Sequence, residues 1–375
     1  MEEIFQTDQL IKYIYIHVPF CLKKCNYCSF YSEIYSDDLK KKFVSYLIKE
    51  IKLFKNKFHL KSETIYFGGG TPSLLSPEDI NNIISEFNLT DIKEITLEAN
   101  PLNIDKIYAK ELAETLINRI SLGVQSFLDK ELELLGRLHN AEQIYKAYEN
   151  LRNSGFKNIS FDLIYGLPNQ TIEDVSFSLE RMVDLDPEHI STYCLSLEKD
   201  VPLYNMKKQI PSDEEVSEFY YFIRDKLMTA GYEHYEISNF AKEGFESRHN
   251  LCYWNDEFYL GLGPAASGYI ERNRYTNPSD LYEYFIQIET LEVFGNFRSL
   301  SKSDHEKEFI FLSLRKTVGM NLKEFQKKFQ TDFLKKYSKI IAKYLENKFI
   351  EIEEEFIRLT PKAYFVSDEI FSEFV

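Results

Sequence analysis

The chain has little of what marks a protein that binds nucleic acid or lies in a membrane. Its 375 residues include 45 lysines and arginines against 60 aspartates and glutamates, a formal charge of −15. No extended basic patch offsets this excess, so a nucleic-acid or anionic-membrane partner is not expected. No apolar run approaches membrane-spanning length, and the first residues lack a secretory signal. We therefore expect a cytoplasmic protein without an integral membrane segment.

Cysteine is also scarce, and its distribution argues against a disulfide framework. Three of the five cysteines, Cys21, Cys25 and Cys28, lie close together, while Cys194 and Cys252 are isolated. In a cytosolic protein, clustered cysteines are metal ligands or catalysts more often than disulfides. We interpret the cluster as a ligand set and the isolated cysteines as small core residues.

The cysteine cluster follows a run of β-branched and aromatic residues, 13–18, which ends at Pro19. This pattern predicts a buried strand that presents the cysteines at its C-terminal end. Structural zinc sites and closed iron–sulfur clusters normally use four protein ligands, so three cysteines leave one position open. The alternative is a zinc site completed by a histidine such as His17 or by a fourth cysteine.

The rest of the first half alternates between short apolar runs and helical periodicity. About six strand–helix repeats fill the chain up to residue 200. Such alternation predicts parallel strands with right-handed crossovers. The fold class that we expect is α/β, with a partial TIM-like (β/α)6 barrel over residues 1–200.

Two further regions are expected after the barrel. Residues 201–302 form a barrel extension, in which residues 249–254 read HNLCYW and the stretch 261–268 is a glycine-rich loop. Residues 303–375 predict three helices and a two-stranded ribbon, a winged-helix-like C-terminal domain. This region is rich in glutamate, so a packing or docking role is favoured over DNA binding.

Polar and glycine residues recur where the predicted strands end. The triplet 68–70 is all glycine, and without Cβ atoms its backbone can approach a small charged group. Glu98, Gln125 and Asp162 end or nearly end the following strands, and Arg137 lies between the last two. A series of such residues around one barrel face predicts a binding site, since barrel enzymes place their active sites there.

The Cys21-x3-Cys25-x2-Cys28 spacing resembles the radical S-adenosylmethionine (SAM) superfamily. In that superfamily three cysteines bind three irons of a 4Fe-4S cluster, and the fourth iron binds the amino and carboxylate groups of SAM. The resemblance implies that these three cysteines are the metal ligands of the chain and that SAM fills the open position.

Longer motifs are similar to the oxygen-independent coproporphyrinogen III oxidase family. They read YIHVPFC at 15–21, FGGGTPS at 67–73, GVQSF at 123–127 and DLIYGLP at 162–168. The similarity covers nearly the whole chain, including its C-terminal part. It implies SAM contacts at Tyr15, Tyr27, Gly70, Thr71, Glu98, Gln125, Arg137 and Asp162.

Two departures within that family match its HemW branch, whose members look like heme chaperones. The oxidases resemble Cys-x3-Cys-x2-Cys-x-Cys and have a longer N-terminal extension, whereas here Phe30 stands at the position of the fourth cysteine. The HemW branch also shows a His-Asn-x-x-Tyr-Trp motif, which matches residues 249–254.

The resemblance implies heme contacts at His249, Asn250, Tyr253 and Trp254, with His249 as a ligand of the heme iron. A neutral imidazole can ligate heme iron, and tyrosine and tryptophan offer flat apolar surface to a porphyrin. The alternative is a core tryptophan beside a hydrogen-bonded histidine.

Three functions are weighed on these grounds. The leading hypothesis is a heme chaperone of the radical SAM fold, which holds heme, a 4Fe-4S cluster and SAM and delivers heme to apoproteins such as respiratory cytochromes. The alternative is an enzyme, the coproporphyrinogen III oxidase itself, which decarboxylates propionates in a SAM-dependent radical reaction to give protoporphyrinogen IX. A third hypothesis is a zinc-stabilised barrel with a DNA-binding winged helix. The acceptor, the oligomeric state and the cleavage of SAM stay open.

Overall fold

The computed structural model describes residues 10–291 and 296–374, so the expectation for the first residues lies outside the described part. Its main feature is a 12-stranded sheet whose centre is parallel. The six central strands are β1 (Leu10–Val18), β4 (His59–Gly69), β5 (Glu94–Ala99), β6 (Arg119–Gln125), β7 (Ile159–Tyr165) and β8 (His189–Cys194). They pair in sequence order, which confirms the predicted α/β class and the partial barrel.

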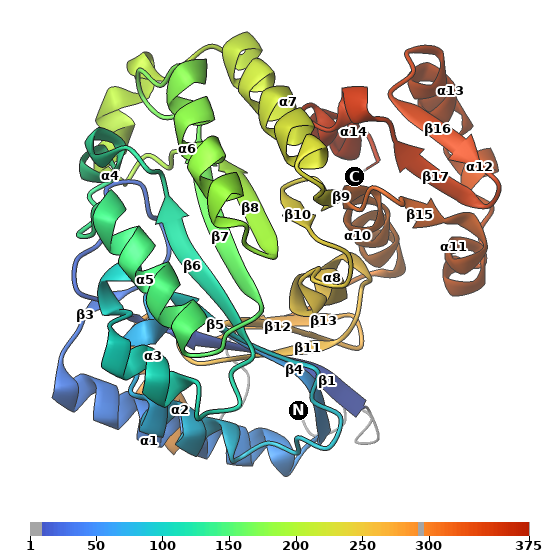
Figure 1. The fold of residues 1–375 in the computed structure, drawn as a ribbon. Coiled ribbons are helices and arrows are strands. Elements are labelled where there is room, and N and C mark those ends of the chain that lie inside the picture. Colours follow the sequence, from blue (N-terminus) through green and yellow to red (C-terminus); the bar gives the residue numbers. More distant parts are fainter. Residues whose placement is uncertain (1–9, 292–295, 375) are drawn as a thin grey trace.

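Helices follow these strands and cover the outer face of the curved sheet (Figure 1). They are α1 (Asp37–Lys55), α2 (Pro77–Ile84), α3 (Lys106–Leu112), α4 (Asp129–Leu134), α5 (Ala141–Asn153), α6 (Ile172–Leu185) and α7 (Asp213–Thr229). Ser76, Asn140 and Thr171 begin α2, α5 and α6 with reciprocal capping boxes, which satisfy backbone N–H groups of the first turn.

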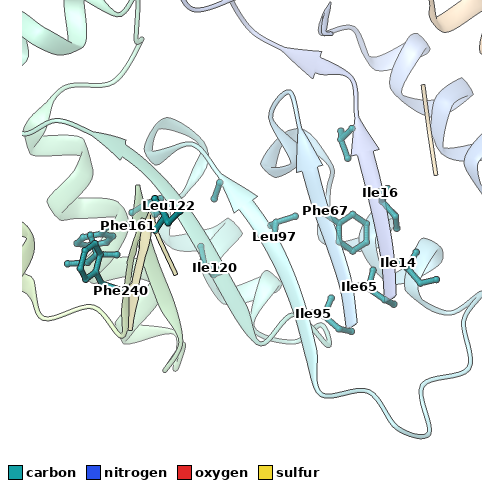
Figure 2. Packing of buried hydrophobic residues seen from close by; sticks show 14 of the residues in the cluster. Ile14, Ile16, Ile65, Phe67, Ile95, Leu97, Ile120, Leu122, Phe161 and Phe240 are labelled. Carbon is teal, nitrogen blue, oxygen red and sulfur yellow. The ribbon is translucent and has the colours of Figure 1, made fainter. Parts of the chain in front are cut away.

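The core between sheet and helices is built from alternate residues of neighbouring strands (Figure 2). Ile65 and Phe67 of β4 and Ile95 and Leu97 of β5 are fully buried, and β6 continues the row. Successive side chains of a strand point to opposite faces. Residues between these core positions therefore face the interior of the barrel, where the site lies.

Both edges of the parallel sheet are extended. On the β8 side lie β10 (Asn239–Ala241) and β9 (Glu233–Glu236). On the β1 side, β11 (Tyr259–Leu262) pairs parallel to β1, an arrangement that sequence periodicity did not suggest. Three antiparallel strands complete that edge, β12 (Ser267–Ile270), β13 (Asn273–Thr276) and β14 (Asn296–Ser299).

The predicted glycine-rich loop over 261–268 is shorter in the structure: residues 263–266 form the turn, and the two ends belong to β11 and β12. The glycines at these ends serve close approach. A Cβ on Gly261 would lie 2.0 Å from the Ser267 carbonyl oxygen. The Tyr275 hydroxyl also lies 3.0 Å from both the amide nitrogen and the carbonyl oxygen of Gly261.

The C-terminal part carries the predicted ribbon, and a third strand joins it. Its elements are α10 (Lys302–Arg315), β15 (Met320–Asn321), α11 (Leu322–Phe329), α12 (Phe333–Lys336), α13 (Ser338–Glu346), β16 (Ile350–Glu353), β17 (Phe356–Leu359) and α14 (Ser367–Ser372). It lies beside α7 and α8 (Arg248–Trp254), at one side of the barrel (Figure 1). The domain boundaries at residues 200 and 302 stay predictions. Within the described residues, no helix has the length and apolar character needed to cross a bilayer.

Candidate functional site

A cavity of about 520 Å³ lies inside the barrel, at the end where the parallel strands finish. It is lined by many of the residues that the sequence singled out: Cys21, Cys25, Cys28, Tyr27, Gly70, Thr71, Glu98, Gln125, Arg137, Asp162 and Asn250. Tyr15, His249, Tyr253 and Trp254 are not part of its lining. The structure thus brings the predicted cluster and SAM residues together, with one exception, and separates most of the predicted heme motif from them.

The exception is Tyr15, whose side chain lies against the cavity wall. Its ring stacks on Tyr66, which does line the cavity, with the ring centroids 6.2 Å apart. Its hydroxyl lies 3.1 Å from Nδ1 of His17. The SAM contact expected of Tyr15 stays a prediction.

The loop that carries the cysteines is fixed to the barrel by backbone contacts. The Asn26 amide donates to the Leu135 carbonyl at 2.9 Å, and the Asn26 side chain donates to the Leu134 carbonyl at 2.9 Å. The Leu203 amide in turn donates to the Asn26 carbonyl at 2.9 Å. The three cysteines are free and partly exposed, so their sulfurs are available to a ligand at the cavity.

The polar groups beside the cysteines suit a thiolate ligand set. Arg137 Nη1 lies 3.7 Å from Cys25 Sγ, and Nη2 donates to the Gly123 carbonyl at 3.0 Å. Arg137 Nε is buried and has no hydrogen-bond partner among residues 10–291 and 296–374. Burial raises the pKa of the Cys28 thiol. Metal ligation needs the deprotonated sulfur, and Arg137 places a positive charge beside Cys25.

A site for one metal ion fits the same residues less well. Among the described residues, no three His, Cys, Asp or Glu side chains converge to hold a single ion. His17 is buried, and its Nδ1 and Nε2 lie 3.1 Å and 3.0 Å from the Tyr15 hydroxyl and the Tyr31 carbonyl oxygen. Zinc ligation by His17 would break one of these hydrogen bonds. Three thiols around a larger cavity fit a 4Fe-4S cluster, whose irons take one cysteine each.

The glycine triplet and Glu98 form one unit. The Gly69 amide donates to Glu98 Oε2 at 3.2 Å, and the Tyr66 hydroxyl donates to Glu98 Oε1 at 2.8 Å. A Cβ on Gly68 would lie 3.1 Å from Glu98 Oε1, which shows how closely the backbone approaches. Burial raises the pKa of Glu98 to about 7. This carboxyl group can accept hydroxyl hydrogen bonds from a ligand when it is ionised.

The ends of β6 and β7 contribute the other predicted polar groups. Gln125 has a φ of 68°, a left-handed conformation that is uncommon for a non-glycine residue and often accompanies function. The Ser121 hydroxyl donates to Asp162 Oδ1 at 3.2 Å. Burial raises the pKa of Asp162 to about 6. Two buried carboxyl groups with raised pKa values in one cavity are typical of a functional site.

The helix α8 carries the HNLCYW motif. It packs against β4 and β5 on the side of the barrel away from the cysteines, where β5 begins. The Arg248 and His249 amides each donate to a Glu94 side-chain oxygen at 3.0 Å, so a carboxylate caps the start of the helix. His249 Nδ1 lies 2.7 Å from the Thr64 hydroxyl, and Nε2 lies 2.8 Å from the Tyr253 hydroxyl.

His249 is thereby held inside the protein. Its side chain is 1% exposed, and its ring stacks on Tyr66 with the centroids 5.1 Å apart. Burial lowers the pKa of His249 to about 3. A bond from His249 to heme iron would require one of its two hydrogen bonds to break, so its predicted role as a ligand stays untested.

The other motif residues are divided between two cavities. Asn250 lines the main cavity, whereas Tyr253 and Trp254 line a separate cavity of about 220 Å³. The Arg315 guanidinium lies 4.6 Å from the centre of the Trp254 ring. Cys252 is buried, as predicted, but Cys194 is exposed at the end of β8 and lines the main cavity, so its predicted core position is wrong.

Several lining residues were missed by the sequence interpretation, although a signal for them exists. Starting from Gln125 and counting back by two along β6 gives Gly123, Ser121 and Arg119, all of which line the cavity. Counting back from Tyr193 gives Ser191, which also lines it. Strand periodicity was applied to the apolar residues alone, and the polar residues of the opposite face were left out.

Comparison with known proteins places this site in a family. A profile of the Radical SAM superfamily matches residues 15–182, and a profile of the HemN C-terminal domain matches residues 300–366. The chain is 36% identical over 369 residues to "Heme chaperone HemW" of Lactococcus lactis, covering 96% of each chain. It is 34% identical over 376 residues to the protein of that name in Bacillus subtilis, covering 97% of this chain and 99% of the relative.

A solved structure shares the fold over the whole chain. The coproporphyrinogen III oxidase HemN from Escherichia coli, described as a radical SAM enzyme, superposes with a TM-score of 0.86. The superposition covers 100% of this chain and 91% of that chain at 23% sequence identity. At this level of identity the likeness shows the fold alone.

Proposed function

The chain belongs to the HemW family of the radical SAM superfamily, and from this premise we propose that it is a heme chaperone that delivers heme to acceptor apoproteins. The cofactors of the family are a 4Fe-4S cluster and SAM, and its cargo is heme. The acceptors that we propose are heme proteins such as respiratory cytochromes.

For the cofactors, we propose that Cys21, Cys25 and Cys28 hold the cluster and that the cavity behind them holds SAM. Arg137 would face the carboxylate of SAM, because its guanidinium lies beside the cysteines. Glu98 would accept hydrogen bonds from the ribose hydroxyls, in addition to the two that it receives from Tyr66 and Gly69. When bound, the cluster and SAM supply one-electron chemistry, and these residues bind and orient them.

The observation that carries the heme proposal is an apolar rim at the cavity. Leu22, Phe30, Leu138 and Tyr193 line the cavity and are exposed, and Phe30 is 66% exposed. Large exposed apolar side chains grouped around a cavity are typical of a binding site. Aromatic rings and aliphatic side chains offer the apolar surface that the face of a porphyrin needs. Phe30 also stands at the position where the oxidases have a fourth cysteine.

The test is to reconstitute the cluster anaerobically and to assay two reactions on the same preparation. The first assay measures heme binding and heme transfer to an apocytochrome, and the second measures SAM-dependent conversion of coproporphyrinogen III. A chaperone binds and transfers heme and leaves coproporphyrinogen unchanged.

Phe30→Asp and Phe30→Leu form a matched pair for this test. The charged variant should weaken heme binding, because it places a carboxylate on the apolar rim, and the apolar variant should retain it. Conversion of coproporphyrinogen with cleavage of SAM, or failure of the wild-type protein to bind heme, would overturn the proposal.

A further inference from the structure

Arg119 is a charged residue buried inside the barrel. It is the first residue of β6, its side chain is 2% exposed, and it lines the main cavity. Its Nε is buried and finds no hydrogen-bond partner within the described part of the chain. No ion pair within 4.0 Å and no hydrogen bond joins its guanidinium to any described residue.

A buried guanidinium without a bonded partner is costly. Arginine stays protonated in proteins, and a buried charge normally persists only when it is paired and hydrogen-bonded. The nearby carboxyl groups do not pair with it, since Glu98 accepts from Tyr66 and Gly69 and Asp162 accepts from Ser121. The positive charge of Arg119 partly offsets the burial that raises the pKa of these two carboxyl groups.

A second uncommitted group lies on the same cavity. Asn250 contributes its backbone amide to the cap of α8, and its carboxamide makes no hydrogen bond to a described residue. This residue enters the cavity from α8, on the side away from the cysteines. Arg119 and Asn250 thus offer hydrogen-bond donors that nothing in the described chain uses; we name this pair the barrel floor.

These donors fit a carboxylate better than a more highly charged anion. A guanidinium binds a carboxylate through two parallel hydrogen bonds, and an amide can add a third. Glu98 and Asp162 line the same cavity and would repel a dianion such as phosphate more strongly than a single negative charge.

The carboxylate of SAM is not a good candidate for this position. Arg119 and Gln125 are at opposite ends of β6, so their Cα atoms are roughly 20 Å apart at the usual rise of a strand. Arg137 and the cysteines lie at the Gln125 end, where the SAM carboxylate is expected. A carboxylate at the barrel floor therefore belongs to another ligand.

We propose that Arg119 and Asn250 form a carboxylate-binding position that takes a propionate group of the tetrapyrrole. The proposal rests on the proposed function, which supplies a ligand with propionate side chains. The macrocycle enters the cavity edge-on past the apolar rim, with its propionate edge leading, so that one propionate reaches the barrel floor.

The test compares iron protoporphyrin IX with its dimethyl ester, which lacks free carboxylates, on anaerobically reconstituted protein. Affinities are measured from the absorbance change of the porphyrin. Arg119→Gln should weaken heme binding by about 10- to 100-fold, as expected for the loss of a charged hydrogen bond, and leave the affinity for the ester unchanged. Asn250→Asp keeps the shape of the side chain and adds a negative charge. It should also weaken the binding of heme and leave the affinity for the ester unchanged.

The controls separate this proposal from its premise. Arg298→Gln removes an exposed arginine, 74% accessible, and should change neither affinity. If the wild-type protein binds neither porphyrin, the proposed function fails. If it binds heme but the variants weaken heme and ester equally, or neither, the barrel floor is not a propionate site. If Arg119→Gln lost the binding of SAM but kept the binding of 5′-methylthioadenosine, Arg119 would bind the SAM carboxylate, and the propionate proposal would be overturned. Should Arg119→Gln not fold, Asn250→Asp decides.

Discussion

The two ends of the barrel use similar residue types in opposite ways. At the cysteine end, thiols, Arg137 and Glu98 line a cavity, and Arg137 Nε has no partner in the part of the chain that the structure describes. At the α8 end, His249, Thr64 and Tyr253 bond to one another, and Glu94 caps the helix. Similar polar groups are thus bonded to one another around His249, whereas around the cysteines some of them keep free hydrogen-bonding capacity toward the cavity.

The largest effect on the contrast between the two ends of the barrel should come from removing a cysteine. Cys25→Ala should abolish assembly of the cluster, because three thiolates are the minimum set for three irons. Iron content and visible absorbance after anaerobic reconstitution measure this. Cys194→Ala is the matched control, since Cys194 lines the same cavity outside the motif. Equal iron in both variants would contradict the assignment.

At the other end, His249→Ala should act on stability. It removes two buried hydrogen bonds and the stacking on Tyr66, so the free energy of unfolding should fall by about 2–4 kcal/mol. Tyr253→Phe removes one of these bonds and should cost about 1 kcal/mol. Urea unfolding measures both. A His249→Ala protein with wild-type stability that selectively loses heme would make the α8 end a ligand site after all.

A smaller effect is expected from Arg137→Gln. The variant should weaken SAM binding by about tenfold or more, because a charged hydrogen bond to the carboxylate is lost. Equilibrium binding of SAM and of 5′-methylthioadenosine, which lacks the carboxylate, measures this, and only SAM should be affected. Arg298→Gln again serves as the control, and equal weakening of both ligands would show a structural role instead.

The smallest effect is a pH dependence of SAM affinity at the cysteine end. The pKa of Glu98 is raised to about 7, and the ionised form is the one that accepts ribose hydroxyl groups. Affinity should therefore be full above pH 7 and fall by up to about tenfold per unit as pH drops below it. Glu98→Gln should bind more weakly and lose this slope, whereas an unchanged slope would exclude Glu98 as its source.

Particular segments show which parts of the fold could be predicted from the sequence. Short apolar runs and helical periodicity predicted the parallel strands and the helices between them, because these patterns depend on local interactions. The extension of the sheet by β11 could not be predicted, since it depends on pairing between segments more than two hundred residues apart. The same applies to Gly261 and Gly268, whose close contacts come from neighbouring strands.

By itself, the sequence determined which residues meet at the cysteine end. The spacing of Cys21, Cys25 and Cys28 and the polar residues at the strand ends suffice, because parallel strands bring their ends together in any such barrel. Only the tertiary structure decided the opposite end. Whether His249 is free or bonded, and whether Arg119 is paired or alone, depends on which atoms of distant segments lie within hydrogen-bond distance. No local pattern encodes that distance.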